Sequence, residues 1–135
     1  MTDQTFSWPI RIYYESTDAG GVVYHAEYLK FFERARTECL RSLGFEQREL
    51  REREGVVFVV RSMQIKYVQP ARFDEMLEVA SKLVEVGRCR LVFEQKLLRG
   101  SDILTDATVE VVSVDSTSFK PVAIPALIRE KMETP

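Results

Sequence analysis

The sequence predicts an α+β fold in which an antiparallel sheet curls around one long helix. A strand-like segment is followed by one long amphipathic helical pattern, and four further strand-like segments then follow with no comparable helix between them. Parallel βαβ units would need helices between those later strands, so the sheet is expected to be antiparallel. The 135 residues are most simply a single domain covering positions 1–135.

The first predicted strand runs from Ser7 to Glu15. Apolar residues occupy every second position, which is the period of a strand with one buried face: Trp8, Ile10, Ile12 and Tyr14. Asp18, Gly20 and Gly21 follow closely, and glycines allow the positive φ angles that tight turns use. The chain is therefore expected to turn directly after this strand.

The long helical pattern extends from about His25 to Leu43. Its apolar face is traced by Tyr28, Leu29, Phe32, Ala35, Cys39, Leu40 and Leu43. Gly44 supplies a left-handed stop. Residues 46–53 are highly charged and are expected to form a connector, with a short surface helix closing at Gly55 as the alternative.

The later strands are expected near 56–68, 76–86, 88–99 and 103–114, separated by short segments that fit hairpins or bends. Residues 121–124 are expected to add a short edge strand, and Pro125 to open a final helical turn or two through Met132. One helix cannot cover both faces and both edges of such a sheet. We therefore expect a homo-oligomer, either a dimer with a continuous sheet or a tetramer.

Composition and charge argue against several classes of protein. Lys and Arg total 19 against 21 Asp and Glu, without a block of like charge, so no nucleic-acid partner is expected. Cys39 and Cys89 have no CxxC spacing and no second histidine nearby, so neither a metal site nor a redox pair is expected. The N-terminal residues do not resemble a signal peptide, and Val56–Val60 is too short to cross a bilayer. We expect a cytoplasmic protein.

The segment Tyr14–His25 concentrates the candidate chemistry. It holds Asp18, two adjacent glycines and the only histidine of the chain, His25, at the entrance to the long helix. No Ser, Thr, Asp or Asn stands immediately before Ala26 as a cap. The amides near Tyr24, His25 and Ala26 are therefore candidates for an oxyanion hole.

This segment resembles the signature of the YbgC-like proteins, which belong to the 4-hydroxybenzoyl-CoA thioesterase type of acyl-CoA thioesterase and are associated with the Tol-Pal envelope system. The resemblance covers most of the chain. The residues that carry it are Tyr13, Tyr14, the run Thr17–Ala26, Tyr28, Glu33–Glu38, Phe58–Arg61, Tyr67, Pro70–Arg72 and Asp74.

The resemblance implies a hotdog fold, in which a five- or six-stranded antiparallel sheet wraps the long helix, with active sites at the interfaces of dimers. It implies hydrolysis of acyl-CoA with Asp18 as nucleophile or general base, a choice that the sequence leaves open. The backbone N–H of His25 is the implied oxyanion donor, and Gly20 and Gly21 would let the substrate approach. Relatives commonly carry a second acid two residues before the catalytic aspartate. This chain has Ser16 at that position, so Asp18 would act without a second carboxylate. No metal is implied, and no cofactor beyond the coenzyme A of the substrate.

An ionised carboxylate can attack the electrophilic carbonyl of a thioester or activate water, which supports the same chemistry independently. Further candidates for substrate binding are Tyr14, Gly20, Gly21, Val22, Val23, Tyr24, Arg61, Arg88 and Arg90. Tyr14 lines the site or occupies the core. Arg61 interrupts an apolar strand face, so either a bulge turns it outward or it meets an anion. Arg88 and Arg90 are two positions apart and so lie on the same face of the predicted strand. They either bind the phosphates of the coenzyme or form a solvated strand end.

Without the family resemblance, the sequence leaves two roles open for each of three side chains. Asp18 also fits a plain turn residue, and His25 fits a packed histidine as well as one that orients the substrate. Glu33 is a rival base, and its second possible role is an ion pair with Arg34 or Arg36.

The leading hypothesis is a cytoplasmic acyl-CoA thioesterase, with the inner-membrane surface as a second possible place of action and acyl carrier protein thioesters as further substrates. A non-catalytic adaptor of lipid synthesis that binds acyl carrier protein is the first rival hypothesis. A hotdog dehydratase that uses His25 is the second. The sequence does not determine the acyl chain length or a preference for aromatic acyl groups.

Overall fold

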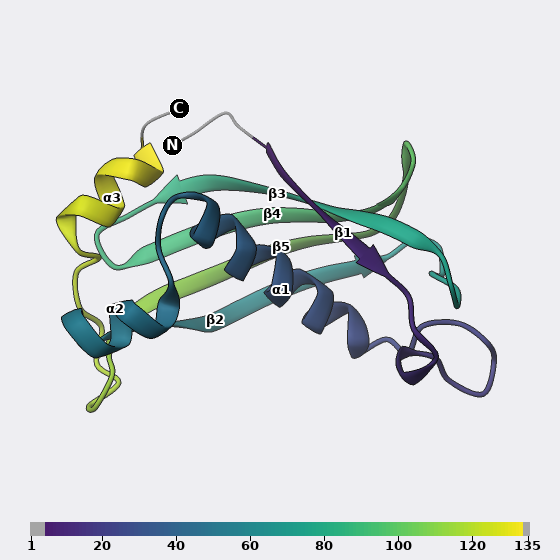
Figure 1. Cartoon of the computed structure of the whole chain (residues 1–135), viewed down its shortest axis with the longest axis horizontal. Coiled ribbons are helices and arrows are strands. Elements are labelled where there is room, and N and C mark those ends of the chain that lie inside the picture. The colour runs from purple at the N-terminus through teal and green to yellow at the C-terminus, as the bar shows by residue number, and fades with distance from the viewer. Residues whose placement is uncertain (1–4, 134–135) are drawn as a thin grey trace.

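The computed structural model describes residues 5–133. Its elements are β1 (Thr5–Arg11), the 3-10 turn η1 (Tyr14–Ser16), α1 (Glu27–Ser42), α2 (Gln47–Glu54), β2 (Val56–Tyr67), β3 (Met76–Val86), β4 (Arg90–Arg99), β5 (Asp102–Asp115) and α3 (Ala126–Glu133). All strand pairs are antiparallel, and the sheet order is β1-β3-β4-β5-β2. Figure 1 shows α1 lying across one face of the sheet, which confirms the predicted arrangement.

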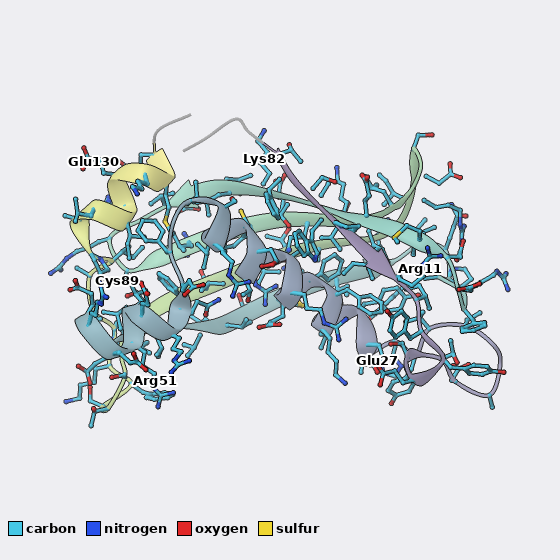
Figure 2. All side chains as sticks on the ribbon, viewed as in Figure 1. Arg11, Glu27, Arg51, Lys82, Cys89 and Glu130 are labelled. Carbon is cyan, nitrogen blue, oxygen red and sulfur yellow. The ribbon has the colours of Figure 1, made fainter. Side chains whose placement is uncertain are left out.

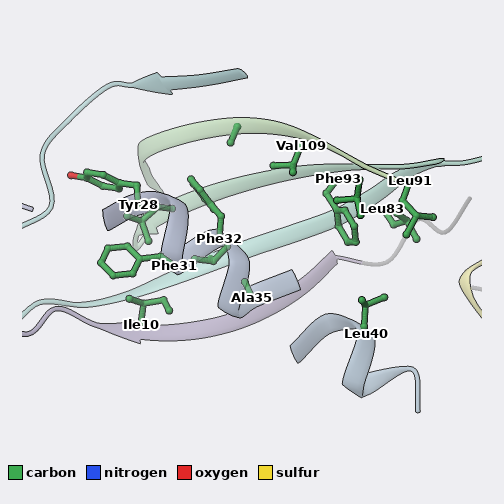
Figure 3. Packing of buried hydrophobic residues seen from close by; sticks show 14 of the residues in the cluster. Ile10, Tyr28, Phe31, Phe32, Ala35, Leu40, Leu83, Leu91, Phe93 and Val109 are labelled. Atoms are coloured by element: carbon green, nitrogen blue, oxygen red, sulfur yellow. The ribbon is translucent and has the colours of Figure 1, made fainter. Parts of the chain in front are cut away.

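The core lies between α1 and the face of the sheet that it covers. Phe31, Phe32 and Ala35 are buried on the helix, and Phe93 and Leu91 are buried on β4 (Figure 3). Burying side chains of this size is the main source of stability in a domain of this length.

The buried face of α1 differs from the predicted one at Leu29, which is exposed, whereas Phe31 is buried. The reason is that the face is centred on Phe31, Phe32 and Ala35, and Leu29 points away from that centre. Tyr28 is buried as expected.

The first strand ends four residues earlier than predicted, at Arg11. Ile12 stays buried, and its N–H donates to the carbonyl of Glu75 rather than to a strand partner (2.9 Å). The chain then turns through η1, so Tyr14 leaves the alternating pattern. Its side chain is 76% exposed, and its ring contacts the ring of Phe73 at a tilt, with 4.5 Å between centroids. The prediction that would place Tyr14 in the core is wrong.

The segment at the C-terminal end of β5 also differs from the expectation. Residues 121–124 form no strand. Pro121 and Val114 form an isolated bridge, and the N–H groups of Val122 and Ile124 donate to the carbonyls of Ser113 and Arg88. Proline lacks the N–H that a strand ladder needs, which limits the pairing. The final helix is confirmed as α3, which follows Pro125.

The charged connector forms α2, which is the helical alternative of the prediction, with Leu50 as its buried residue. Gly55 ends the helix in the left-handed conformation, with φ of 65°. We expect Gly55→Ala to lower the free energy of unfolding by about 1 kcal/mol, because a Cβ is unfavourable at this φ. The atom nearest to that Cβ would be Ser116 Oγ at 3.9 Å, so lack of space is not the cause.

Urea denaturation of the two proteins measures this difference. Gly55→Asn is the matched control, since asparagine tolerates the left-handed region and should lose less stability. Equal losses in the two variants would contradict a backbone origin.

A polar network crosses the apolar core between α1 and the sheet. The guanidinium of Arg36, which is only 7% exposed, donates to Gln95 Oε1 at 2.9 Å. The amide nitrogen of Gln95 donates in turn to the Phe32 carbonyl (3.0 Å) and to Ser81 Oγ (2.9 Å). Gln95, which lies on β4, therefore connects the charged Arg36 of α1 with Ser81 of β3.

Candidate active site

The loop that carries Asp18 is a tight turn at the end of the molecule opposite α2 and α3 (Figure 1). Thr17 and Val23 form a bridge, and the N–H of Asp18 donates to the Val22 carbonyl at 2.9 Å. Gly21 closes the turn with φ of 79°, a conformation that favours glycine. The sequence prediction of a turn here is confirmed.

The carboxylate of Asp18 is exposed and partly committed to this turn. Its Oδ1 accepts the N–H of Gly20 at 2.8 Å. Within residues 5–133, the second oxygen has no hydrogen-bond partner. A Cβ on Gly20 would lie 3.2 Å from Asp18 Oδ1, so a larger residue there would crowd the carboxylate. The loop thus presents one free carboxylate oxygen to solvent.

The loop is anchored to the scaffold by backbone hydrogen bonds. The N–H of Val23 donates to the Ala71 carbonyl, and the N–H of Tyr24 donates to the Ser16 carbonyl, both at 2.9 Å. The N–H of Ala71 donates to the hydroxyl of the buried Tyr28 at 3.0 Å. These contacts fix the loop against α1 and the segment before β3.

The start of α1 has no side-chain cap. Ala26 is the N-cap residue and makes no side-chain capping bond, and the N–H of Glu27 donates to the Tyr24 carbonyl at 2.8 Å. In the described part of the chain, the N–H groups of His25 and Ala26 donate to no other group. The N–H of Tyr24 is already used by Ser16. Of the amides proposed from the sequence, those of His25 and Ala26 are therefore the ones open to a ligand.

A hollow of about 280 Å³ has His25 in its wall. It is lined by Val23, His25, Tyr28, Tyr67, Val68, Gln69 and Pro70. The His25 ring contacts two tyrosine rings, with ring centroids 4.5 Å from Tyr24 and 6.4 Å from Tyr67. The hydroxyl of Tyr67 donates to the His25 carbonyl at 2.8 Å.

Tyr28 and Tyr67 were not site candidates from the sequence. Tyr28 fits an ordinary apolar helix position, and Tyr67 fits the end of a strand far from Asp18 along the chain. Their approach to the loop depends on how α1 lies on the sheet. The one signal in the sequence is the family resemblance, which includes both tyrosines.

Arg61 does not lie with the loop. The β2–β5 register shifts between Val60 and Ser62, which confirms the predicted possibility of a bulge. The Arg61 side chain is 70% exposed, and its Nε lies 3.5 Å from Glu110 Oε1.

Arg88 and Arg90 lie at the far end of the same protomer. Cys89, between them, is at the end of the sheet opposite Glu27, the first residue of α1 (Figure 2). Arg90 pairs with Val112 of β5, which pairs with Val59 of β2. At about 3.3 Å per residue, β2 spans roughly 26 Å between Val59 and Tyr67. One protomer therefore does not bring these arginines to Asp18.

The two arginines differ in their contacts. Arg90 forms ion pairs with Glu85 and Glu110, and its hydrogen bond to Glu110 raises the pKa of its guanidinium. Within residues 5–133, the exposed side chain of Arg88 makes no ion pair. Arg88 is thus the freer of the two candidates for a phosphate.

Glu33, the rival base, lies on the exposed side of α1, and its Oε1 accepts the Thr37 hydroxyl at 3.3 Å. Arg36 turns into the core toward Gln95 instead of forming the expected ion pair with Glu33. Glu33 lies seven residues after Ala26, which is about two helical turns from the free amides at the start of α1. This distance along the helix separates Glu33 from the Asp18 loop.

Comparison with known proteins gives a consistent result. The family model described as thioesterase superfamily matches residues 20–105. The chain is 50% identical over 129 residues to an acyl-CoA thioesterase named YbgC from Haemophilus influenzae, covering 96% of this chain and 95% of the relative. It is 48% identical over 129 residues to an acyl-CoA thioester hydrolase named YbgC from Escherichia coli O157:H7, covering 95% and 96%.

A solved structure of a probable thioesterase from Bartonella henselae superposes with a TM-score of 0.87 at 38% identity, covering 90% of this chain and 100% of that one. This match and the observed sheet confirm the predicted hotdog fold. No helix in the described part of the chain is long and apolar enough to cross a membrane. By its sequence and its fold, the chain belongs to the thioesterase superfamily.

Proposed function

We propose that this protein hydrolyses the thioester of acyl-CoA to a free acid and coenzyme A. The observation that carries the proposal is the exposed Asp18 carboxylate in a glycine turn that leads directly to the uncapped start of α1. Relatives named acyl-CoA thioesterase, at 50% and 35% identity, support the same substrate class.

The proposed chemistry divides between the carboxylate and the helix start. The N–H of His25 donates to the carbonyl oxygen of the thioester, where negative charge develops, and the positive end of the α1 dipole adds to this stabilisation. Asp18 either removes a proton from the attacking water or attacks the carbonyl carbon itself. The carbon–sulfur bond then breaks and the thiolate takes up a proton. If Asp18 is the nucleophile, water then hydrolyses the acyl anhydride on Asp18, which releases the free acid and restores the carboxylate. This scheme needs no metal and no separate cofactor.

A homodimer would complete the site. β2 is an edge strand with exposed apolar residues such as Val60, and an unpaired edge of this kind favours pairing with a second copy. Antiparallel pairing of two β2 strands would bring the Arg88 end of one protomer toward the Asp18 end of the other. Two such dimers would form the homotetramer, and light scattering measures which assembly exists in solution.

Arg88 is proposed to bind the phosphates of coenzyme A. We expect Arg88→Gln to raise KM for acyl-CoA about tenfold with kcat unchanged, because a charged hydrogen bond to phosphate contributes roughly 1.5–3 kcal/mol. The measurement is a steady-state comparison of acyl-CoA with the matching acyl-pantetheine, which lacks the nucleotide. An equal KM increase with both substrates would show that Arg88 does not act on the phosphates.

The experiment that tests the function is thiol release from a panel of acyl-CoAs that vary in chain length and in aromatic character. Acyl carrier protein thioesters form a second panel, since the same chemistry would act on them. If no thioester in either panel is hydrolysed, the proposed function is wrong and a non-catalytic role gains support. A product that keeps its thioester would instead indicate dehydration. The proposed place of action is the cytoplasm, including the inner-membrane surface.

A further inference from the structure

A tyrosine from the end of β2 holds the peptide group that opens α1. The Tyr67 hydroxyl donates to the His25 carbonyl at 2.8 Å, across 42 positions of the sequence. The carbonyl of His25 and the N–H of Ala26 belong to one planar peptide group. A hydrogen bond to the oxygen of a peptide group polarises that group and strengthens its N–H as a donor.

The preceding peptide group is bonded in the same way. Its oxygen, the Tyr24 carbonyl, accepts the N–H of Glu27 at 2.8 Å, and its nitrogen is the free amide of His25. Each of the neighbouring free amides therefore belongs to a peptide group whose oxygen is already engaged. One oxygen is engaged by the helix itself and the other by the side chain of Tyr67.

Tyr67 is well placed to be a fixed donor. It pairs with Thr105 of β5 as the last residue of β2, and its ring packs edge-on against the buried Tyr28 at 5.3 Å between centroids. The phenol of tyrosine is protonated at neutral pH, and partial desolvation raises the pKa of the Tyr67 phenol further.

The loop does not depend on Tyr67 for its position. The bonds from Val23 to Ala71 and from Tyr24 to Ser16, with the bridge between Thr17 and Val23, hold the loop without it. Tyr67 is itself 45% exposed, and its hydroxyl reaches the loop only at the His25 carbonyl. Loss of this hydroxyl should therefore alter one peptide group and leave the fold of the loop unchanged.

We propose that Tyr67 is a positioning residue for thioester hydrolysis: it orients and polarises the His25–Ala26 peptide, so that the N–H of Ala26 acts as a second oxyanion donor beside the N–H of His25. The proposal rests on the proposed function and deepens it. Tyr67 does not touch the reacting atoms, and its effect passes through the backbone. A stronger N–H donor stabilises the substrate oxygen more as negative charge develops on it. The hydrogen bond of Tyr67 should therefore lower the energy of the transition state and raise kcat, with little effect on substrate binding.

The test compares Tyr67→Phe with wild type. Direct loss of an oxyanion donor lowers kcat by about 10²–10³-fold, so we expect an indirect effect of about tenfold on kcat with KM unchanged. Tyr13→Phe is the matched control, because the Tyr13 hydroxyl is exposed and has no hydrogen-bond partner within residues 5–133. The control should keep wild-type kinetics.

Two inhibitors separate positioning from a structural effect. An S-alkyl-CoA thioether has no carbonyl, so its inhibition constant should be the same for Tyr67→Phe and wild type. A trifluoromethyl ketone analogue of acyl-CoA, whose oxygen mimics the oxyanion, should bind about tenfold more weakly to the variant. The ratio of the two constants does not depend on the fraction of folded enzyme, so a less stable variant still answers the question.

Three outcomes overturn the proposal. These are wild-type kinetics in Tyr67→Phe, a rise in KM with kcat unchanged, and equal weakening of both inhibitors. If Asp18→Asn is inactive while Tyr67→Phe matches wild type, the proposed function stands and only the role of Tyr67 fails. If the wild type hydrolyses no thioester, both proposals fail.

Discussion

Replacement of Asp18 by asparagine is expected to lower kcat/KM for acyl-CoA by on the order of 10³-fold, the range that a lost base or nucleophile produces. Asparagine keeps a side-chain oxygen that can accept the N–H of Gly20, so the turn should remain intact. The change removes the negative charge and the basicity of the free carboxylate oxygen. The loss should therefore lie in kcat, with the affinity for a thioether inhibitor retained.

The measurement is thiol release by the variant, with circular dichroism to check the fold. Glu15→Gln is the matched control, since it makes the same chemical change at an exposed residue of the adjacent turn. Wild-type activity in Asp18→Asn, or equal losses in both variants, would show that Asp18 is not the catalytic group. With wild type, entry of ¹⁸O into Asp18 during a single turnover in H₂¹⁸O would show that Asp18 is the nucleophile, because this entry requires a covalent intermediate.

Gln95→Leu is expected to lower the free energy of unfolding by about 3 kcal/mol, although leucine is similar in size and more apolar. Gln95 is fully buried and is the hydrogen-bond acceptor for the Arg36 guanidinium. Its removal leaves a charge in the core without that acceptor. It also takes a donor from the Phe32 carbonyl and from Ser81 Oγ.

The double variant Arg36→Met with Gln95→Leu is the control for this interpretation. It removes the charge together with its acceptor, and we expect it to recover a large part of the lost stability. Urea denaturation of the wild type, both single variants and the double variant measures the coupling. Strictly additive losses would show that the two side chains do not stabilise each other.

The sequence by itself determined the elements and the central segment of the site. Local periodicity of apolar residues decides whether a segment is a strand or a helix, so β2 to β5, α1 and α2 were all expected near their observed positions. Asp18, Gly20, Gly21 and His25 lie together because they are neighbours in the chain, and a glycine turn before an uncapped helix is a local feature.

The tertiary structure alone decided which distant residues meet. Tyr14 follows the strand period, yet the turn at η1 exposes it, and Arg61 is turned outward by a bulge that periodicity left open. Tyr67 reaches the His25 carbonyl, and Gln95 reaches Arg36, only through the order and register of the strands beneath α1. Contacts of this kind depend on how elements pack on each other, and apolar periodicity specifies which face of an element is buried but not its partner.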